Sequence, residues 1–103
     1  MNDKIYYGFE WEEDKNTTNK RKHGISFESA ARVFNDPCVW TEYDFEHSEK
    51  EDVFKNMGLV NGVVVVAVWT TERGERTRII TARKANSREI KIYEKHAKDL
   101  QIH

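Results

Sequence analysis

The hydrophobic pattern of the first 37 residues predicts one strand followed by two helices. Residues 5–11 are rich in aromatic side chains and predict a short strand. Residues 12–23 are polar and good helix formers, and Gly24 follows them where a left-handed residue would end a helix. Ser26 is suited to cap a second helix, which residues 35–37 (Asn-Asp-Pro) would end. Its apolar face has the helical spacing i, i+3, i+4, i+7 and consists of Phe27, Ala30, Ala31 and Phe34.

The rest of the chain has the pattern of β-strands and then of one more helix. Asn61-Gly62 is a strong hairpin signal between two of the strands. Residues 63–68 show no polar alternation, which predicts a central strand covered on both faces. Asn86 or Ser87 would cap the last helix, with Glu89 at capping-box distance from Asn86. The predicted strands cover residues 39–45, 53–60, 63–71 and 76–84.

The resulting order, β-α-α-β-β-β-β-α, predicts an α+β fold with helices packed on an antiparallel sheet. A chain of 103 residues is expected to form a single domain over 1–103. No apolar run approaches the roughly 20 residues of a membrane helix, and the polar first residues lead into no signal-type segment. Cys38 is the only cysteine, so no internal disulfide can form. We therefore expect a cytoplasmic protein that does not contact a membrane.

The charge is distributed unevenly along the chain. The net charge of −1 does not suggest a nucleic-acid binder. Residues 1–60 nevertheless carry 13 acids and 8 bases, a net of −5, while residues 61–103 carry 5 acids and 9 bases, a net of +4. The second half therefore suggests a basic face, although a solvated C-terminal helix rich in lysine and arginine accounts for the same numbers.

Basic residues recur along the last predicted strand. Because side chains of a regular strand alternate between its faces, Arg76, Arg78 and Lys84 are expected on one face and Arg83 on the other. A guanidinium among apolar neighbours needs an anion, and arginine binds phosphate through two hydrogen bonds. On the residues alone, pairing with Glu72, Glu75 or Glu89, or exposure of the charged ends to water, is the favoured explanation.

Lys22-His23, at the end of the first predicted helix, is the second candidate for chemistry. A histidine can act as a general acid or base, and a lysine can hold a phosphate. Stabilisation of the helix C-terminus by cations is the simpler explanation for both residues. The acids of residues 44–52 resemble a metal cluster in composition, but a mobile acidic loop is favoured, and neither a metal site nor a cofactor is predicted. We expect the remaining histidines to be surface residues: His47, His96 and His103.

Two blocks of sequence, which together span about residues 8–94, have motifs in a fixed order and spacing. The first block contains Phe9-Glu10-Trp11, Lys15, Asn19, Lys22-His23-Gly24, Ser26-Phe27-Glu28, Ala30-Ala31, Val33-Phe34 and Asp36-Pro37. The second contains Thr71-Glu72-Arg73-Gly74, Arg78 to Ala85, Arg88-Glu89 and Tyr93.

These two blocks resemble the BrnT family of toxins. The resemblance implies a RelE-like fold, metal-independent endoribonuclease activity and arrest of translation. It also implies a BrnA-like antitoxin that binds the toxin directly and contacts operator DNA on behalf of the complex, with a homodimer or heterotetramer as possible assemblies.

The resemblance assigns catalytic roles to four residues: Lys22, His23, Arg78 and Arg83. In the mechanism we expect, the RNA 2′-OH attacks the phosphate while His23 or Lys22 assists proton transfer, and an arginine stabilises the growing charge. Since a regular strand places Arg78 and Arg83 on opposite faces, one is expected to act directly and the other to tie the strand to Glu89. Further RNA contacts are expected from Arg73, Arg76 and Lys84.

This chain departs from the family pattern at two places. The family often has an Arg-Trp pair before Gly58, where this chain has Val53-Phe54, and an aromatic residue where this chain has Thr70. If the absent arginine is catalytic in relatives, activity here is weakened, and Lys50 or Lys55 are the candidates to replace it. A decayed module that binds the antitoxin and modulates transcription without cutting RNA is therefore the alternative. The net charge weakens a third hypothesis, independent nucleic-acid binding.

Overall fold

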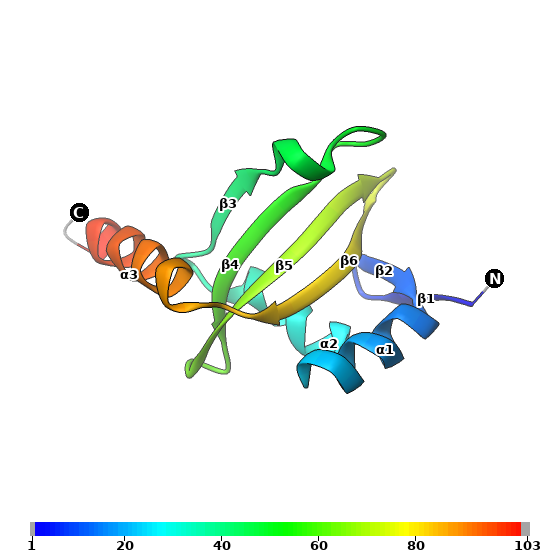
Figure 1. The fold of residues 1–103 in the computed structure, drawn as a ribbon, viewed down its shortest axis with the longest axis horizontal. Helices are drawn as coiled ribbons and strands as arrows, with labels where there is room; N and C mark the ends of the chain where they lie inside the picture. Colours follow the sequence, from blue (N-terminus) through cyan, green and yellow to red (C-terminus); the bar gives the residue numbers. More distant parts are fainter. Residues whose placement is uncertain (1, 102–103) are drawn as a thin grey trace.

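The computed structural model describes residues 2–101 and contains a six-stranded sheet with the order β1-β2-β6-β5-β4-β3 (Figure 1). The fold is thus a mixed α+β fold with helices packed on a sheet, as predicted. The strands are β1 (Asp3–Tyr6), β2 (Phe9–Glu12), β3 (Trp40–Tyr43), β4 (Phe54–Val60), β5 (Val64–Arg73) and β6 (Arg76–Lys84). The helices are α1 (Glu13–His23), α2 (Phe27–Ala30) and α3 (Ser87–Gln101), with 3-10 segments η1 (Ala31–Asn35) and η2 (Phe45–His47). In the described residues, no helix is both long and apolar enough to cross a membrane.

The N-terminal segment differs from the prediction, because the single strand expected over residues 5–11 is a hairpin of β1 and β2. Tyr7 has φ 56°, a left-handed conformation that is uncommon for a bulky residue, and it reverses the chain together with Gly8. β2 then pairs with β6 in parallel, matching Phe9 with Thr77 and Glu10 with Arg78. The prediction of a purely antiparallel sheet is therefore wrong at this junction.

The second helix is also shorter than its apolar spacing predicts. The Ser26 hydroxyl accepts a hydrogen bond from the backbone N–H of Ser29 at 3.1 Å, which confirms the cap. After Ala30 the chain tightens into the 3-10 segment η1, which turns through three residues per turn rather than 3.6. The change of period buries Val33 completely and leaves Phe34 half-buried.

β5 lies at the centre of the sheet, as its continuous apolar sequence predicts. It pairs with β4 through a hairpin in which Asn61 and Gly62 have φ 56° and 71°, and with β6 on its other side. Val66 and Val68 pack against α2 and η1 in the main core, while Ala67 faces a smaller cluster with Met57 and Tyr93 of α3. Helices thus cover one face of the sheet broadly, and α3 covers one end of the other, here called the α3 face (Figure 1).

α3 is held to the sheet by a few polar contacts. Its capping box is present, since Asn86 Oδ1 accepts from the Glu89 backbone N–H at 2.9 Å and Glu89 Oε1 accepts from the Asn86 N–H at 2.8 Å. The Tyr93 hydroxyl donates to Asp36, which also accepts from the backbone N–H of Leu59 at 2.7 Å. Hydrogen bonds outweigh the opposing effect of burial and lower the pKa of Asp36, so this anchor is a carboxylate.

A β-bulge in β6 changes which arginines share a face. Trp69 of β5 pairs with Thr81, but its neighbour Thr70 pairs with Ile79, so Ile80 has no partner on β5. A strand's side chains alternate between the two faces of the sheet, and an extra residue shifts this alternation by one position for all residues that follow it. Arg78 pairs with Thr71 and Arg83 with Ala67, and both of these β5 residues point to the α3 face. The expectation that Arg78 and Arg83 lie on opposite faces is therefore wrong.

Candidate functional site

A cleft of about 470 Å³ opens on the α3 face, where three separate parts of the chain meet. The end of α1 contributes one part of the lining, and the bulged region of β5 and β6 contributes another. The third part comes from the segment between β3 and β4, residues 44–53, here called the connector. The cleft combines aromatic and aliphatic surface with several ionisable groups, a composition typical of ligand sites. Its lining residues are His23, His47, Glu51, Val53, Trp69, Ile80, Thr81 and Arg83.

Asn19 explains how the end of α1 reaches this cleft. Of β6, only the first part pairs with β2, and α1 continues directly from β2 along the remaining edge of β6. The buried Asn19 side chain accepts from the Thr81 hydroxyl at 3.0 Å and from the Ala82 backbone N–H at 3.1 Å, and donates to the Ile25 carbonyl at 2.9 Å. Asn19 thus fixes α1 beside the bulge and gives the backbone N–H of Ala82 a hydrogen-bond acceptor.

The Lys22-His23 pair lies beside β6 as a consequence. Gly24 ends α1 with φ 73°, and its N–H donates to the Lys20 carbonyl at 2.9 Å, as the sequence predicts. His23 is exposed and lines the cleft together with Arg83. Lys22 lines an adjoining hollow that shares His23 and the bulge residues Ile80 and Thr81. The structure therefore brings His23 and Arg83 into one cleft and keeps Lys22 at its margin.

Arg83 belongs to a cluster in which two cations share one buried carboxylate. Arg83 donates to both oxygens of Glu89, at 2.7 and 2.9 Å, and the Lys55 ammonium also contacts Glu89. Arg83 and Lys55 lie over the Trp69 ring, 5.0 and 5.4 Å from its centre. Burial would raise the pKa of Glu89, but bonds from Arg83, Lys55 and the Asn86 backbone lower it to about 2. The cluster therefore keeps a net charge of +1 beside the cleft.

Asp44 and His47 form a second cluster on the connector. The Nδ1 atom of His47 lies 2.8 Å from Asp44 Oδ2, and the same oxygen accepts from the Trp69 indole N–H at 2.8 Å. The other Asp44 oxygen accepts from the His47 backbone N–H at 3.2 Å. Burial would raise the pKa of Asp44, but its bonds with His47 and Trp69 lower it. Trp69 thus joins the two clusters, because its indole N–H bonds Asp44 while its ring contacts Arg83.

Arg78 lies outside the cleft. Its guanidinium donates to Glu10 at 2.6 Å and to Asp3 at 3.3 and 3.4 Å, and so joins β1 and β2 to β6. Hydrogen bonds from Arg78 to Asp3 and Glu10 outweigh the effect of burial and raise the pKa of Arg78. With only 17% of its side chain exposed, Arg78 is engaged in holding the parallel strand junction.

The three residues predicted as additional RNA contacts are placed differently from one another. Arg73 and Arg76 are exposed and lie opposite each other beside the β5–β6 turn. Their side chains are on the α3 face, as is that of Arg83. Arg73 also donates to Glu51 at 3.1 Å, which ties the connector to β5. Lys84 pairs with Val66, points to the opposite face and lines a different groove beside α3.

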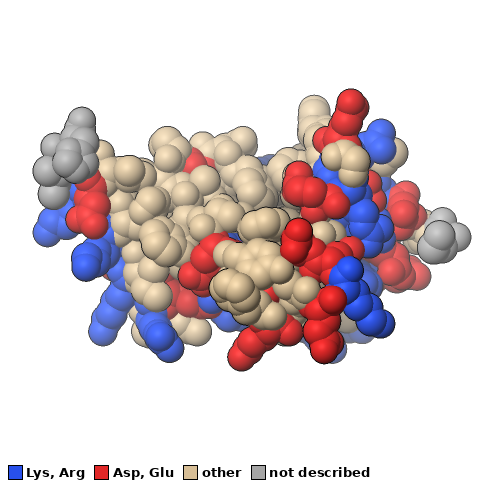
Figure 2. Space-filling model, turned by 90° about the horizontal axis from the view of Figure 1, so that it is seen from above, with Lys and Arg blue, Asp and Glu red and all other residues tan. Residues whose placement is uncertain are grey.

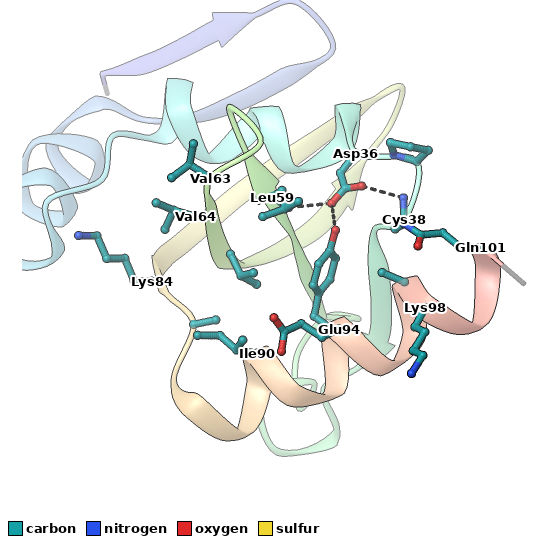
Figure 3. Close-up of a pocket in the computed structure, with 15 residues that line it drawn as sticks. Asp36, Cys38, Leu59, Val63, Val64, Lys84, Ile90, Glu94, Lys98 and Gln101 are labelled. Atoms are coloured by element: carbon teal, nitrogen blue, oxygen red, sulfur yellow. Dashed lines mark hydrogen bonds between the residues drawn. The ribbon is translucent and has the colours of Figure 1, made fainter.

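That second groove, of about 740 Å³, lies between α3 and the ends of β4 and β5 (Figure 3). Its lining is mainly aliphatic, and Figure 3 shows Leu59, Val64 and Ile90 facing it. The Asp36 carboxylate in its wall is already bonded to Leu59, Cys38 and the Tyr93 hydroxyl. The groove therefore offers apolar surface rather than a set of groups suited to catalysis.

Acidic side chains gather over the middle of the molecule seen from above, where Figure 1 places η2 and the connector (Figure 2). In the described residues, Asp44, Glu46 and His47 offer ligand atoms within 4.8 Å of one another. Both Asp44 oxygens already accept hydrogen bonds and His47 Nδ1 faces Asp44, so we assign no metal site here.

The sequence matches the family model described as "Ribonuclease toxin, BrnT, of type II toxin-antitoxin system" over residues 11–89. This chain belongs to the BrnT family. A solved structure of the Brucella abortus ribonuclease toxin BrnT is similar in fold, with a TM-score of 0.57 and 24% identity, covering 75% of this chain and 94% of that one. A search of curated proteins found no significant match. Family membership confirms the predicted class, a ribonuclease toxin of a type II toxin–antitoxin system.

The two positions at which the sequence resemblance suggested a departure from the BrnT pattern, Val53 and Thr70, are both buried. Val53 lines the cleft, and the Thr70 hydroxyl accepts from the Asn56 amide at 3.0 Å. Of the two lysines named with that expectation, Lys55 belongs to the Arg83 cluster, whereas Lys50 is exposed on the connector.

Sequence reasoning missed the groups that the connector contributes. His47 was expected to be an ordinary surface residue; its side chain is exposed, yet it is bonded to Asp44 and lines the cleft. The only local signal is the spacing of three residues between Asp44 and His47, which lets the aspartate cap a single helical turn. His96 contacts Trp40 away from the cleft, and His103 lies outside the described residues.

Proposed function

We propose that this chain is a metal-independent endoribonuclease whose cleavage of RNA arrests translation. The observation that carries the proposal is the cleft in which His23, from the end of α1, and Arg83, from β6, line one surface. An imidazole can move protons near neutral pH, and a guanidinium can stabilise the charge that grows on a phosphate. The RelE-like relationship implied by the sequence resemblance remains part of this proposal.

Each predicted residue has a specific role in the proposed reaction. His23 transfers a proton, Lys22 holds the approaching backbone from the margin of the cleft, and Arg83 faces the scissile phosphate. Arg78 serves to hold β2 on β6, since its guanidinium is occupied by Asp3 and Glu10. Arg73 and Arg76 extend the phosphate-binding surface along the α3 face. Lys84 points away and has no place in this surface.

The Arg83–Glu89 pair is compatible with phosphate binding because Glu89 is shared. Lys55 also contacts this carboxylate, so one positive charge in the cluster is not neutralised. Arg83 keeps 35% of its side chain exposed, and Trp69 beneath it offers an aromatic surface suited to a nucleobase. Glu89 thus fixes the guanidinium in place rather than removing its charge from the cleft.

Type II membership implies an antitoxin partner. We propose that the partner is a BrnA-like protein that binds this chain directly and makes the contacts to operator DNA. A homodimer and a heterotetramer with the antitoxin are the assemblies consistent with this scheme. The cytoplasmic location remains a prediction from the sequence.

Induced expression in bacteria tests the proposed activity. Growth should stop when the chain is produced and should recover when the neighbouring antitoxin gene is produced with it. Ala substitutions at His23 and Arg83 should relieve the arrest. Arg32→Ala is a matched control, since Arg32 is exposed on η1, lies outside the cleft lining and donates a hydrogen bond to the Asn61 side chain. Undiminished arrest in every cleft variant would overturn the proposal.

Val53 favours one alternative, a decayed binding module without nuclease activity. Val53 is buried in the wall of the cleft, and the sequence resemblance implies that relatives often have arginine at this position, so that a cation would be missing from the place where RNA would bind. Under this alternative the chain still binds its antitoxin and modulates transcription. Normal growth during expression, together with a stable complex with the antitoxin, would favour it.

A further inference from the structure

The connector supplies a second histidine to the cleft that contains His23. His47 belongs to η2, and its side chain is 66% exposed while its ring is held in place. His23 and His47 thus line one cleft from two elements that are 24 positions apart in the sequence. Two imidazoles at one site can divide acid and base catalysis between them, because a neutral ring accepts a proton and a protonated ring donates one.

Asp44 determines which nitrogen of His47 is available. An ionised carboxylate only accepts hydrogen bonds, so the His47 Nδ1 atom, 2.8 Å from Asp44 Oδ2, carries a hydrogen and donates it. In the neutral ring the lone pair then lies on Nε2, the one ring nitrogen left for a ligand in the cleft. Trp69 holds Asp44 from the floor of the cleft, so this orientation is supported by the sheet.

We propose that His47 is the general base of the RNA cleavage reaction and that His23 is its general acid. This inference rests on the proposed nuclease function. His47 Nε2 takes the proton of the 2′-OH as the 2′-oxygen forms a bond to phosphorus. The bond from phosphorus to the 5′-oxygen breaks, and His23 donates a proton to that oxygen. The products are a 2′,3′-cyclic phosphate and a 5′-hydroxyl, and Asp44 acts as a positioning residue.

The charged groups around His47 fit this assignment. Arg83 brings a positive charge from β6, and the Glu51 carboxylate, on the same connector, is paired with Arg73. Asp44 and Glu46 each have a carboxylate oxygen within 4.8 Å of a ring nitrogen of His47. Asp44 stabilises the imidazolium that forms once the proton has been taken. Within residues 2–101, no carboxylate is bonded to the His23 ring as Asp44 is to His47.

A substrate with a sulfur atom in place of the bridging 5′-oxygen distinguishes the two roles. A thiolate leaves without protonation, so this RNA needs a general base but no general acid. A cleavage site is mapped first on a transcript, and short RNAs of that sequence are made with oxygen or sulfur at the scissile bond. Single-turnover rates are then compared for the wild type, His47→Gln, His23→Gln and the control His96→Gln. His96 lies on α3 against Trp40.

His47→Gln is expected to slow both substrates by about 100-fold or more, the usual contribution of a positioned base. His23→Gln should slow the oxygen substrate to a similar extent and the sulfur substrate by less than about tenfold. His96→Gln should match the wild type. Asp44→Asn should move the acidic limb of the pH profile to lower pH, because the carboxylate that stabilises the imidazolium form of His47 is lost. A purely structural loss would leave that limb in place.

Two results would overturn the assignment while leaving the nuclease proposal intact. The first is cleavage by His47→Gln at the wild-type rate. The second is a His47→Gln defect that disappears on the sulfur substrate, which would make His47 the acid. A wild-type protein that cuts neither RNA would instead overturn the nuclease proposal and this inference with it.

Discussion

At the scale of single residues, Trp69 joins charged groups on two sides of the cleft. Its indole N–H holds Asp44, and its ring lies beneath the charged ends of Arg83 and Lys55. Cations over an aromatic face gain a modest attraction while they stay accessible to solvent. One side chain thus positions a histidine on the connector and a guanidinium on β6.

Arg78 and Arg83 should differ sharply when each is replaced by glutamine. Arg83→Gln is expected to lower RNA cleavage by about 100-fold, because one electrostatic contact to the transition state is lost. Arg78→Gln should leave cleavage within about threefold of the wild type and lower the free energy of unfolding by about 2 kcal/mol, since Glu10 loses a charged partner. Rates on a labelled RNA and urea denaturation measure the two effects. Equal loss of cleavage in both variants would contradict the separation of roles.

Glu89 should make the free energy of unfolding depend on pH in the acidic range. Its pKa is lowered from 4.5 to about 2 in the folded chain, so its contribution is fully present above pH 4.5. The contribution should be lost as the pH falls from 4.5 towards 2, and amounts to roughly 3 kcal/mol. Urea denaturation of the wild type and Glu89→Gln as a function of pH measures this, and the difference between them should shrink over that interval. A constant difference would show that the carboxylate charge is not the cause.

At the scale of elements, the bulge in β6 and the edge position of α1 depend on each other. The extra residue Ile80 brings Arg83 to the α3 face, and the backbone N–H of Ala82 is satisfied by Asn19. Asparagine is a poor helix former, yet Asn16 and Asn19 are the buried side chains of α1. This helix is therefore held by hydrogen bonds rather than by an apolar face.

Asn19→Ala should separate α1 from the sheet. The substitution leaves the Ala82 N–H and the Thr81 hydroxyl without their acceptor, and should lower the free energy of unfolding by about 1–3 kcal/mol. Cleavage should fall as well, because His23 follows Asn19 by one helical turn. Thr17→Ala, at an exposed position of the same helix, is the control and should change stability by less than about 0.5 kcal/mol. Similar denaturation curves for both variants would count against this role of Asn19.

At Gly58, β4 approaches the 3-10 segment η1 closely. A Cβ atom at this position would lie 2.9 Å from the Val33 carbonyl oxygen and 3.0 Å from Val33 Cγ1. Gly58→Ala is therefore expected to lower the free energy of unfolding by about 1–3 kcal/mol, the usual cost of overpacking. Gly8→Ala is the control, since a Cβ there meets nothing within 4 Å. Equal stability of the two variants in urea would contradict this account of Gly58.

At the scale of the whole molecule, the sequence predicts the elements better than their arrangement. The caps at Ser26 and Asn86 and the Asn61-Gly62 hairpin are local features, and all three are confirmed. The parallel β2–β6 pair joins residues far apart in the chain, and the hairpin before it depends on a left-handed Tyr7. Neither leaves a local pattern, so the sheet was predicted without its parallel pair.

The candidate site was predicted in part for the same reason. His23 and Arg83 stand in motifs that the family resemblance identifies, and the structure brings them into one cleft. Arg78 stands in the same motif but is directed elsewhere by a bulge that no periodicity reveals. His47 and Asp44 lie in an acidic connector whose composition suggests only a solvated loop. Their relation to the cleft depends on the Trp69 contact, which the sequence does not record.

Analysis of the ends of cleaved RNA tests the central claim most directly. Purified protein is incubated in EDTA with an RNA that contains a mapped cleavage site, and with the same RNA lacking the 2′-hydroxyl at that position. The account predicts cleavage of the first RNA to a 2′,3′-cyclic phosphate and a 5′-hydroxyl, and no cleavage of the second. Cleavage of the 2′-deoxy RNA, 5′-phosphate ends or complete inhibition by EDTA would contradict it.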